Sequence, residues 1–110
     1  MENETNNNEK AVITALKVKG GSENPTSPVG LSRSMLHVLN EHGFVELLSV
    51  GAKSLDIAVS AYKLANIEIK KRHSGIVLVC AHTEDQAMIG DDKTRRTITR
   101  VFPIKTKYVV

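Results

Sequence analysis

The sequence predicts a single small α/β domain of two layers, with the order β-α-β-α-β-β, a four-stranded mixed sheet and two helices on one face. Three observations predict this class. Apolar residues form four short segments and recur at helical spacing in two longer ones. A length of 110 residues suits one domain rather than two. Hydrophobic residues make up 41% and aromatic residues 4%, so Val, Ile, Leu and Ala must build one core.

The chain opens with a polar segment and then a strand. Residues 1–10 contain too little apolar surface to offset the entropy of ordering, so we expect a disordered polar tail. A strand is predicted over 11–18, because the apolar side chains at its even positions share a face. The Gly-Gly-Ser segment at 20–22 ends this strand.

The first helix has clear signals at both ends. Ser27 suits the N-cap position, and Pro28 suits the first turn because its missing N–H is not needed there. A broad apolar stripe follows over 31–39. Gly43 is placed to end the helix in a left-handed conformation.

A second strand is predicted over 44–50 and a second helix after it. We expect Ser54 to cap this helix, Asp56 to lie in its first turn and the cations at 70–72 to lie in its last turn. Its apolar face is formed by Leu55, Ala58, Val59, Tyr62, Ala65 and Ile69.

The last two strands are predicted over 76–83 and 97–103, with Pro103 marking the end of the second. The polar residues 84–93 between them are expected to form a hairpin loop. Since Ile76–Ala81 is apolar on both faces, this strand is expected at the centre of the sheet. Two helices cover only one face, so self-association is expected to cover the other.

Charge is distributed unevenly along the chain. The formal net charge is +3, but residues 1–10 sum to −2, so the remainder carries +5. Six cations and no acid follow from position 93 onward: Lys93, Arg95, Arg96, Arg100, Lys105 and Lys107. This asymmetry is typical of a protein that meets a polyanion, although a solvated strand with a charged tail would look the same.

Four of the basic residues suit contacts with phosphate or a groove. Lys53 stands where the second helix begins, so its side chain and free backbone N–H groups could meet a phosphate together. Lys93, Arg95 and Arg96 flank the hairpin loop, from which an arm could reach into a groove. The alternatives are an ordinary exposed lysine and charges that protect an edge strand from pairing.

The residues capable of catalysis do not assemble into a recognisable site. Cys80 and His82 would share a strand face, as half of a zinc site or as a thiolate–imidazole dyad. A packed structural thiol is favoured, because further ligands and an orienting third group are not evident. The acids of the predicted loop lack a calcium pattern, and the chain has neither a P-loop nor a dinucleotide fingerprint. We therefore expect no enzymatic activity, metal, cofactor or small-molecule substrate.

Several segments together resemble a known family. They are Leu16-Lys17-Val18, Pro28-Val29-Gly30, Val50-Gly51-Ala52, Ala58-Val59, Leu78-Val79-Cys80 with Thr83, and Gly90-Asp91-Asp92-Lys93-Thr94. In order and spacing, they resemble the bacterial stage V sporulation protein S family, and more distantly Alba, the archaeal chromatin protein. The resemblance covers about Leu16 to Pro103. It implies an Alba-like domain over 11–104, between the tail and a short C-terminal extension, 105–110.

The resemblance also implies a dimer or larger assembly that has no cofactor, associates with nucleic acid and regulates sporulation or development. By similarity to Alba, the binding positions would be Lys53 and the hairpin arm from Lys93 to Arg96. Alba has a lysine pair between its first strand and first helix. Here the connection 20–24 has none, so Lys17 and Lys19, just upstream, are the candidate nucleic-acid-binding residues in this part of the chain.

These observations predict a homodimeric nucleic-acid-binding regulator that contacts mainly phosphates, with DNA and RNA both open. The alternative is a protein-interaction or assembly module without direct nucleic-acid binding. A third hypothesis, a hydrolase using Cys80 and His82, requires a reactive thiol. The polar start and the absence of a long apolar run predict a cytoplasmic protein without membrane contact, able to associate with the nucleoid.

Overall fold

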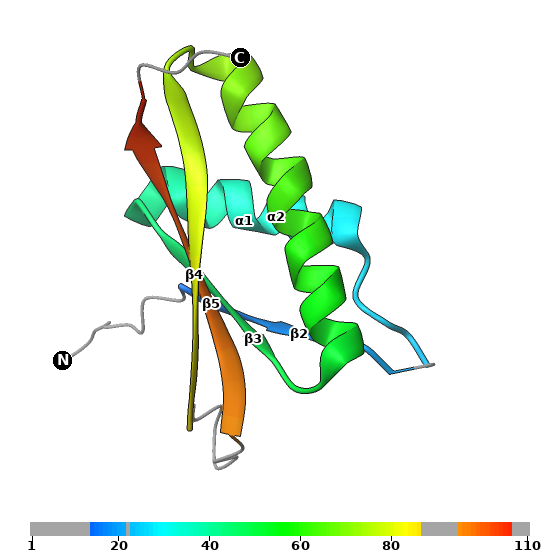
Figure 1. The fold of residues 1–110 in the computed structure, drawn as a ribbon. Helices are drawn as coiled ribbons and strands as arrows, with labels where there is room; N and C mark the ends of the chain where they lie inside the picture. The colour runs from blue at the N-terminus through cyan, green and yellow to red at the C-terminus, as the bar shows by residue number, and fades with distance from the viewer. Residues whose placement is uncertain (1–13, 22, 87–94, 107–110) are drawn as a thin grey trace, which may run out of the picture.

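A four-stranded mixed sheet carries two helices on one face, which confirms the predicted order and layers (Figure 1). The structure is a computed structural model that describes residues 14–21, 23–86 and 95–106. The elements are β2 (Ala15–Val18), α1 (Pro28–His42), β3 (Val45–Ser49), α2 (Ala52–Arg72), β4 (Ile76–Gln86) and β5 (Arg95–Lys105). Outside the described residues lie the predicted tail 1–10, residues 11–13, most of the predicted loop, and 107–110 of the predicted extension.

The strands lie in the order β2-β3-β5-β4. β2 and β3 are parallel and are joined through α1, whereas β5 is antiparallel to both β3 and β4. The prediction that Ile76–Ala81 lies at the centre of the sheet was wrong, because β4 is an edge strand. β5 folds back between β3 and β4 and takes the central position itself.

The hairpin strands are longer than predicted at both ends. Glu84, Asp85 and Gln86 continue β4 and pair with Thr97, Arg96 and Arg95, so they do not belong to a loop. The prediction that Pro103 ends the last strand was also wrong, since β5 continues to Lys105. Proline is tolerated there because β3 begins at Val45, opposite Val101, and needs no N–H from position 103.

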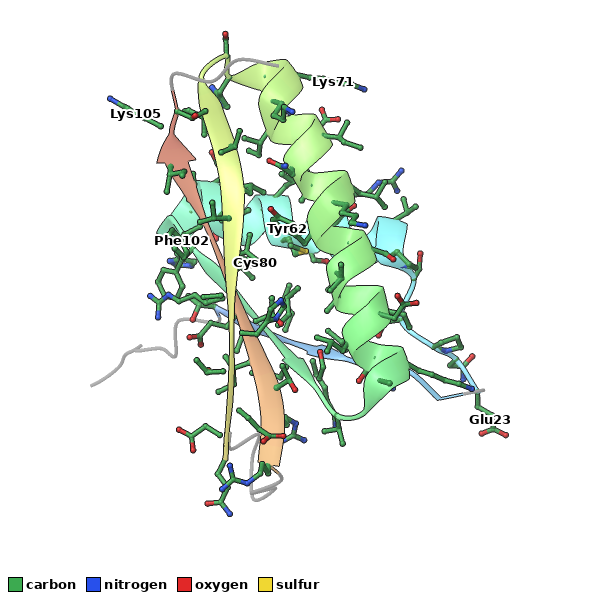
Figure 2. All side chains as sticks on the ribbon, viewed as in Figure 1. Glu23, Tyr62, Lys71, Cys80, Phe102 and Lys105 are labelled. Atoms are coloured by element: carbon green, nitrogen blue, oxygen red, sulfur yellow. The ribbon has the colours of Figure 1, made fainter. Side chains whose placement is uncertain are left out.

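Two side chains of α2 hold the edge of the sheet at Leu78. The Tyr62 hydroxyl donates to the Leu78 carbonyl at 2.8 Å, and the Leu78 N–H donates to Asn66 Oδ1 at 2.8 Å. Figure 2 shows Tyr62 facing β4 from α2. Both outward polar groups of this edge residue are thereby satisfied by side chains rather than by another strand.

The ends of α1 are as predicted. The Ser27 hydroxyl accepts from the Gly30 N–H at 3.3 Å, and Pro28 occupies the first turn. Gly43 adopts φ 83°, and its N–H donates to the Leu39 carbonyl at 2.8 Å. Neither helix of the described residues is long and apolar enough to cross a membrane.

The core lies between the helices and one face of the sheet. Small residues at Ala58, Ala61 and Ala65 let the backbone of α2 approach the strands closely, and all three are fully buried. The larger buried side chains include Met35, Leu47, Leu78, Val45 and Val101. Neither α1 nor α2 covers the opposite face of the sheet, and Phe102 lies on that side (Figure 2).

Candidate nucleic-acid interface

α2 begins earlier than predicted, at Ala52. Gly51, with φ 87°, takes the N-cap position and makes no side-chain capping bond, and Lys53 lies exposed in the first turn. The predictions that Ser54 caps the helix and that Asp56 lies in its first turn were wrong. Ser54 lies inside the helix, 1% exposed, and its hydroxyl donates back to the Val50 carbonyl at 2.6 Å. This helix end therefore offers first-turn N–H groups beside a lysine, with no acid in its first turn.

A close backbone contact sets the β2–α1 connection against this helix end. A Cβ atom built on Gly20 would lie 2.4 Å from the Ser54 nitrogen and 2.9 Å from the Lys53 carbonyl carbon. Only glycine permits that approach. The contact places the exposed Lys19 and Lys53 at one corner of the molecule. Gly20 was predicted only to end the first strand; its close approach to α2 was missed because it depends on a residue 34 positions away.

The backbone of Lys19 is fixed by two reciprocal hydrogen bonds. Its N–H donates to the Thr26 Oγ1 at 2.8 Å, and its carbonyl accepts from the Thr26 N–H at 2.9 Å. The connection that contains Gly20 is thus closed at its base. Lys17, two residues earlier, pairs with Leu48 and is exposed on the sheet face opposite the helices. Lys17 and Lys19 therefore reach the same end of the sheet.

The start of β5 lies at this same end. Thr97 pairs with Ser49, the last residue of β3, from which Val50 and Gly51 lead directly into α2. Arg95, two residues before Thr97, is exposed and pairs with Gln86. The fold thus brings Arg95 to the end of the sheet that carries Lys19 and Lys53. Lys93 lies outside the described residues.

Arg96 is placed differently from its neighbour. It is 3% exposed and pairs with Asp85 across the hairpin, so its guanidinium is not presented to a ligand in this structure. Successive side chains of a strand point to opposite faces, so Arg95 lies on the face of Thr99 and Val101, whereas Arg96 lies on the face of Ile98 and Phe102. The exposed acids Glu84 and Asp85 lie on β4 at the same end and moderate its positive charge.

The cations farther along β5 do not join this group. Arg100 lies over the Phe44 ring, 4.1 Å from its centroid, and its Nη1 is 3.4 Å from Glu46 Oε2. Lys105 pairs with Ile76 at the opposite end of the sheet (Figure 2), about 30 Å from Arg95 at strand rise. The fold therefore divides the basic stretch defined by sequence, and only Arg95 among its described residues is exposed at the same end of the sheet as Lys19 and Lys53.

Cys80 and His82 are brought together with a third residue that sequence reasoning did not find. The Cys80 Sγ lies 3.8 Å from His82 Nε2, and His82 Nδ1 is 2.8 Å from Thr99 Oγ1. Thr99 comes from β5, which the linear spacing of Cys80 and His82 could not reveal. Burial raises the pKa of the Cys80 thiol above its ordinary value of 9.0, so the protonated thiol is favoured over the nucleophilic thiolate. Within the described part of the chain, no three potential ligands gather into a metal site.

No family model matches this chain, and no match is found among curated proteins.

Proposed function

We propose that this chain is a non-enzymatic nucleic-acid-binding protein that acts as a homodimer and contacts mainly phosphates. The observation that carries the proposal is that the fold puts Lys19, Lys53 and Arg95 at the end of the sheet where α2 begins. Cations and free backbone N–H groups at one end of a fold suit contacts with a phosphodiester backbone. The resemblance to the Alba superfamily supports the same assignment and a regulatory function in sporulation or development.

Binding without sequence preference follows from the geometry of this end. The three cations come from a loop, the first turn of α2 and a strand end, so they do not line one helix face that could enter the major groove. Affinity should therefore depend on the number of phosphates neutralised rather than on base identity.

A salt-titrated binding assay tests this proposal with duplex DNA, single-stranded DNA and RNA. The test variant replaces Lys19, Lys53 and Arg95 by alanine. The control replaces Lys63, Lys70 and Lys105, which are exposed elsewhere and remove the same charge. The slope of log K against log salt is negative, and each phosphate contact adds about 0.9 to its magnitude. The test variant should therefore reduce the magnitude of the slope by about 2 to 3. A flat salt dependence, or equal loss in both variants, would refute the proposal.

Self-association through the open sheet face is the second part of the proposal. Val77, Val79, Ile98 and Phe102 share this face and are only partly buried. A second copy would remove this apolar surface from water. Light scattering should give twice the monomer mass of 12.0 kDa, and Phe102→Glu should return it to the monomer value. A monomeric wild type would refute the dimer while leaving the phosphate contacts to be judged separately.

A further inference from the structure

A groove runs between α1 and α2 on the helical layer. It consists of three adjoining hollows of about 390, 380 and 250 Å³, and Leu36 and Arg72 line all three. The two larger hollows are lined by helix residues alone, so they open on the side of the helices away from the sheet. The groove lies apart from the residues assigned to phosphate binding.

Most of the exposed large hydrophobic residues line this groove. Five large hydrophobic residues are exposed among the described residues, and three of them line the same hollow: Val29, Leu64 and Ile67. They are 50%, 39% and 52% exposed. Apolar side chains grouped on an otherwise polar surface are typical of a site that docks another molecule.

The rim of the groove is basic. Among the described residues that line it, Arg33, Lys71 and Arg72 are cationic and Glu68 is the only acid. The Glu68 carboxylate is already engaged by Arg72, with Nε 3.0 Å from Oε2. The rim therefore presents positive charge from both helices, and Lys71 projects near the C-terminal end of α2 (Figure 2).

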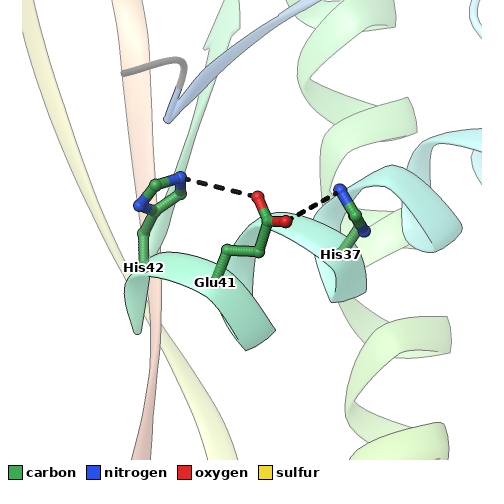
Figure 3. Close-up of polar contacts among 3 residues, drawn as sticks. All are labelled: His37, Glu41 and His42. Carbon is green, nitrogen blue, oxygen red and sulfur yellow. Dashed lines mark ion pairs between the residues drawn. The ribbon is translucent and has the colours of Figure 1, made fainter.

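The acid nearest to this rim on α1 does not reverse that charge. Glu41 lies between two imidazoles, with Oε2 3.4 Å from His37 Nε2 and Oε1 3.8 Å from His42 Nε2 (Figure 3). These contacts are ion pairs when the imidazoles are protonated. Glu41 does not line any of the three hollows, whereas His37 lines one of them.

We infer that this groove binds an acidic amphipathic helix of a protein partner. Its apolar face would cover Val29, Leu64 and Ile67, and its carboxylates would meet Arg33 and Lys71. The lining residues recur at spacings of three or four on α1 and on α2, so each of these two crossing helices presents one stripe of side chains to a docked helix (Figure 1). A nucleic acid fits less well, because the floor is aliphatic and has no aromatic ring on which a base could stack.

Two synthetic peptides test the inference on the full chain. Each has about 18 residues, with leucines on one helical face and either glutamate or lysine at all other positions. Binding is followed by residue-specific NMR shifts on the labelled protein. The acidic peptide should bind and shift α1 and α2 signals around Leu36 and Ile67, and the basic peptide should bind at least about tenfold more weakly.

Matched variants distinguish binding in the groove from nonspecific hydrophobic binding. Ile67→Ser should lower the affinity for the acidic peptide about fivefold or more. Val50→Ser is the control, because Val50 is similarly exposed (55%) but lies outside the groove, and it should change the affinity by less than about twofold. Lys71→Glu should lower the affinity for the acidic peptide more than Lys105→Glu does. Equal binding of both peptides, shifts confined to the open sheet face, or equal effects of Ile67→Ser and Val50→Ser would each overturn the inference. So would a dimer mass that is lost in Ile67→Ser, because it would assign the groove to a second copy.

Discussion

Replacing Gly20 by alanine tests how the lysine corner is built. The added Cβ would lie 2.4 Å from the Ser54 nitrogen and 2.9 Å from the Lys53 carbonyl carbon and the Ser54 Cα. All three atoms belong to the backbone of the first turn of α2, so no side chain can rotate away. To reach an ordinary contact of at least 3.4 Å, the connection and the helix must separate by about 1 Å.

Such a separation disturbs packing at a helix end that carries the buried Ser54. Overpacking of a well-packed site costs about 1 to 3 kcal/mol, and the rigidity of the backbone here places Gly20→Ala toward the upper end. Gly21→Ala is the matched control, because a Cβ at the neighbouring position meets nothing within 4 Å. Neither glycine has a positive φ, so the comparison isolates the contact from backbone strain.

Urea unfolding followed by circular dichroism measures both variants. Gly20→Ala should lower the free energy of unfolding by about 2 to 3 kcal/mol, and Gly21→Ala should change it by less than about 1 kcal/mol. Equal stabilities would show that Gly20 does not hold the β2–α1 connection against α2, and would remove the structural reason for placing Lys19 beside Lys53.

Two further predictions concern the edge strand. Tyr62→Phe should lower the free energy of unfolding by about 1 kcal/mol in thermal or urea unfolding, because it leaves the Leu78 carbonyl without its donor. Iodoacetamide should alkylate Cys80 more slowly at pH 8 than a model thiol, since burial raises its pKa above 9.0, and the rate should rise as the pH passes that value. The raised pKa also means that the native state keeps a proton that the unfolded chain releases, so stability should fall as the pH rises above 9.0. Rapid alkylation at neutral pH would instead favour the thiolate of a hydrolase.

The sequence predicted the elements well where the signal is local. Ser27, Pro28 and Gly43 set the ends of α1 through capping bonds within a few residues, and these predictions are confirmed. The same reasoning misplaced the start of α2, because a positive φ at Gly51 turns the chain before the apparent cap at Ser54. A backbone conformation of this kind leaves no mark in residue type beyond the glycine itself.

Strand position could not be predicted from the same kind of signal. An apolar run on both faces is typical of a central strand, but Ile76–Ala81 lies at an edge and its outward polar groups at Leu78 are satisfied by Tyr62 and Asn66. β5 pairs with β3 on one side and with β4 on the other, and these pairings depend on contacts across the whole domain. The burial of Arg96 beside the exposed Arg95 could not be predicted either, because Arg96 lies on the sheet face opposite the helices, with Ile98 and Phe102, where strand alternation alone predicts exposure.

The two proposed surfaces lie at opposite ends of one helix. Lys53 stands in the first turn of α2 and Lys71 in its last, about 27 Å apart at helical rise. This separation exceeds the Debye length of about 8 Å at physiological ionic strength several times over, so charge at one surface is largely screened from the other. An acidic helix in the groove would therefore not have to leave for a phosphate backbone to bind at the lysine corner. A rigid 21-residue helix that carries both surfaces suits a protein that holds a nucleic acid and an acidic partner at a fixed distance.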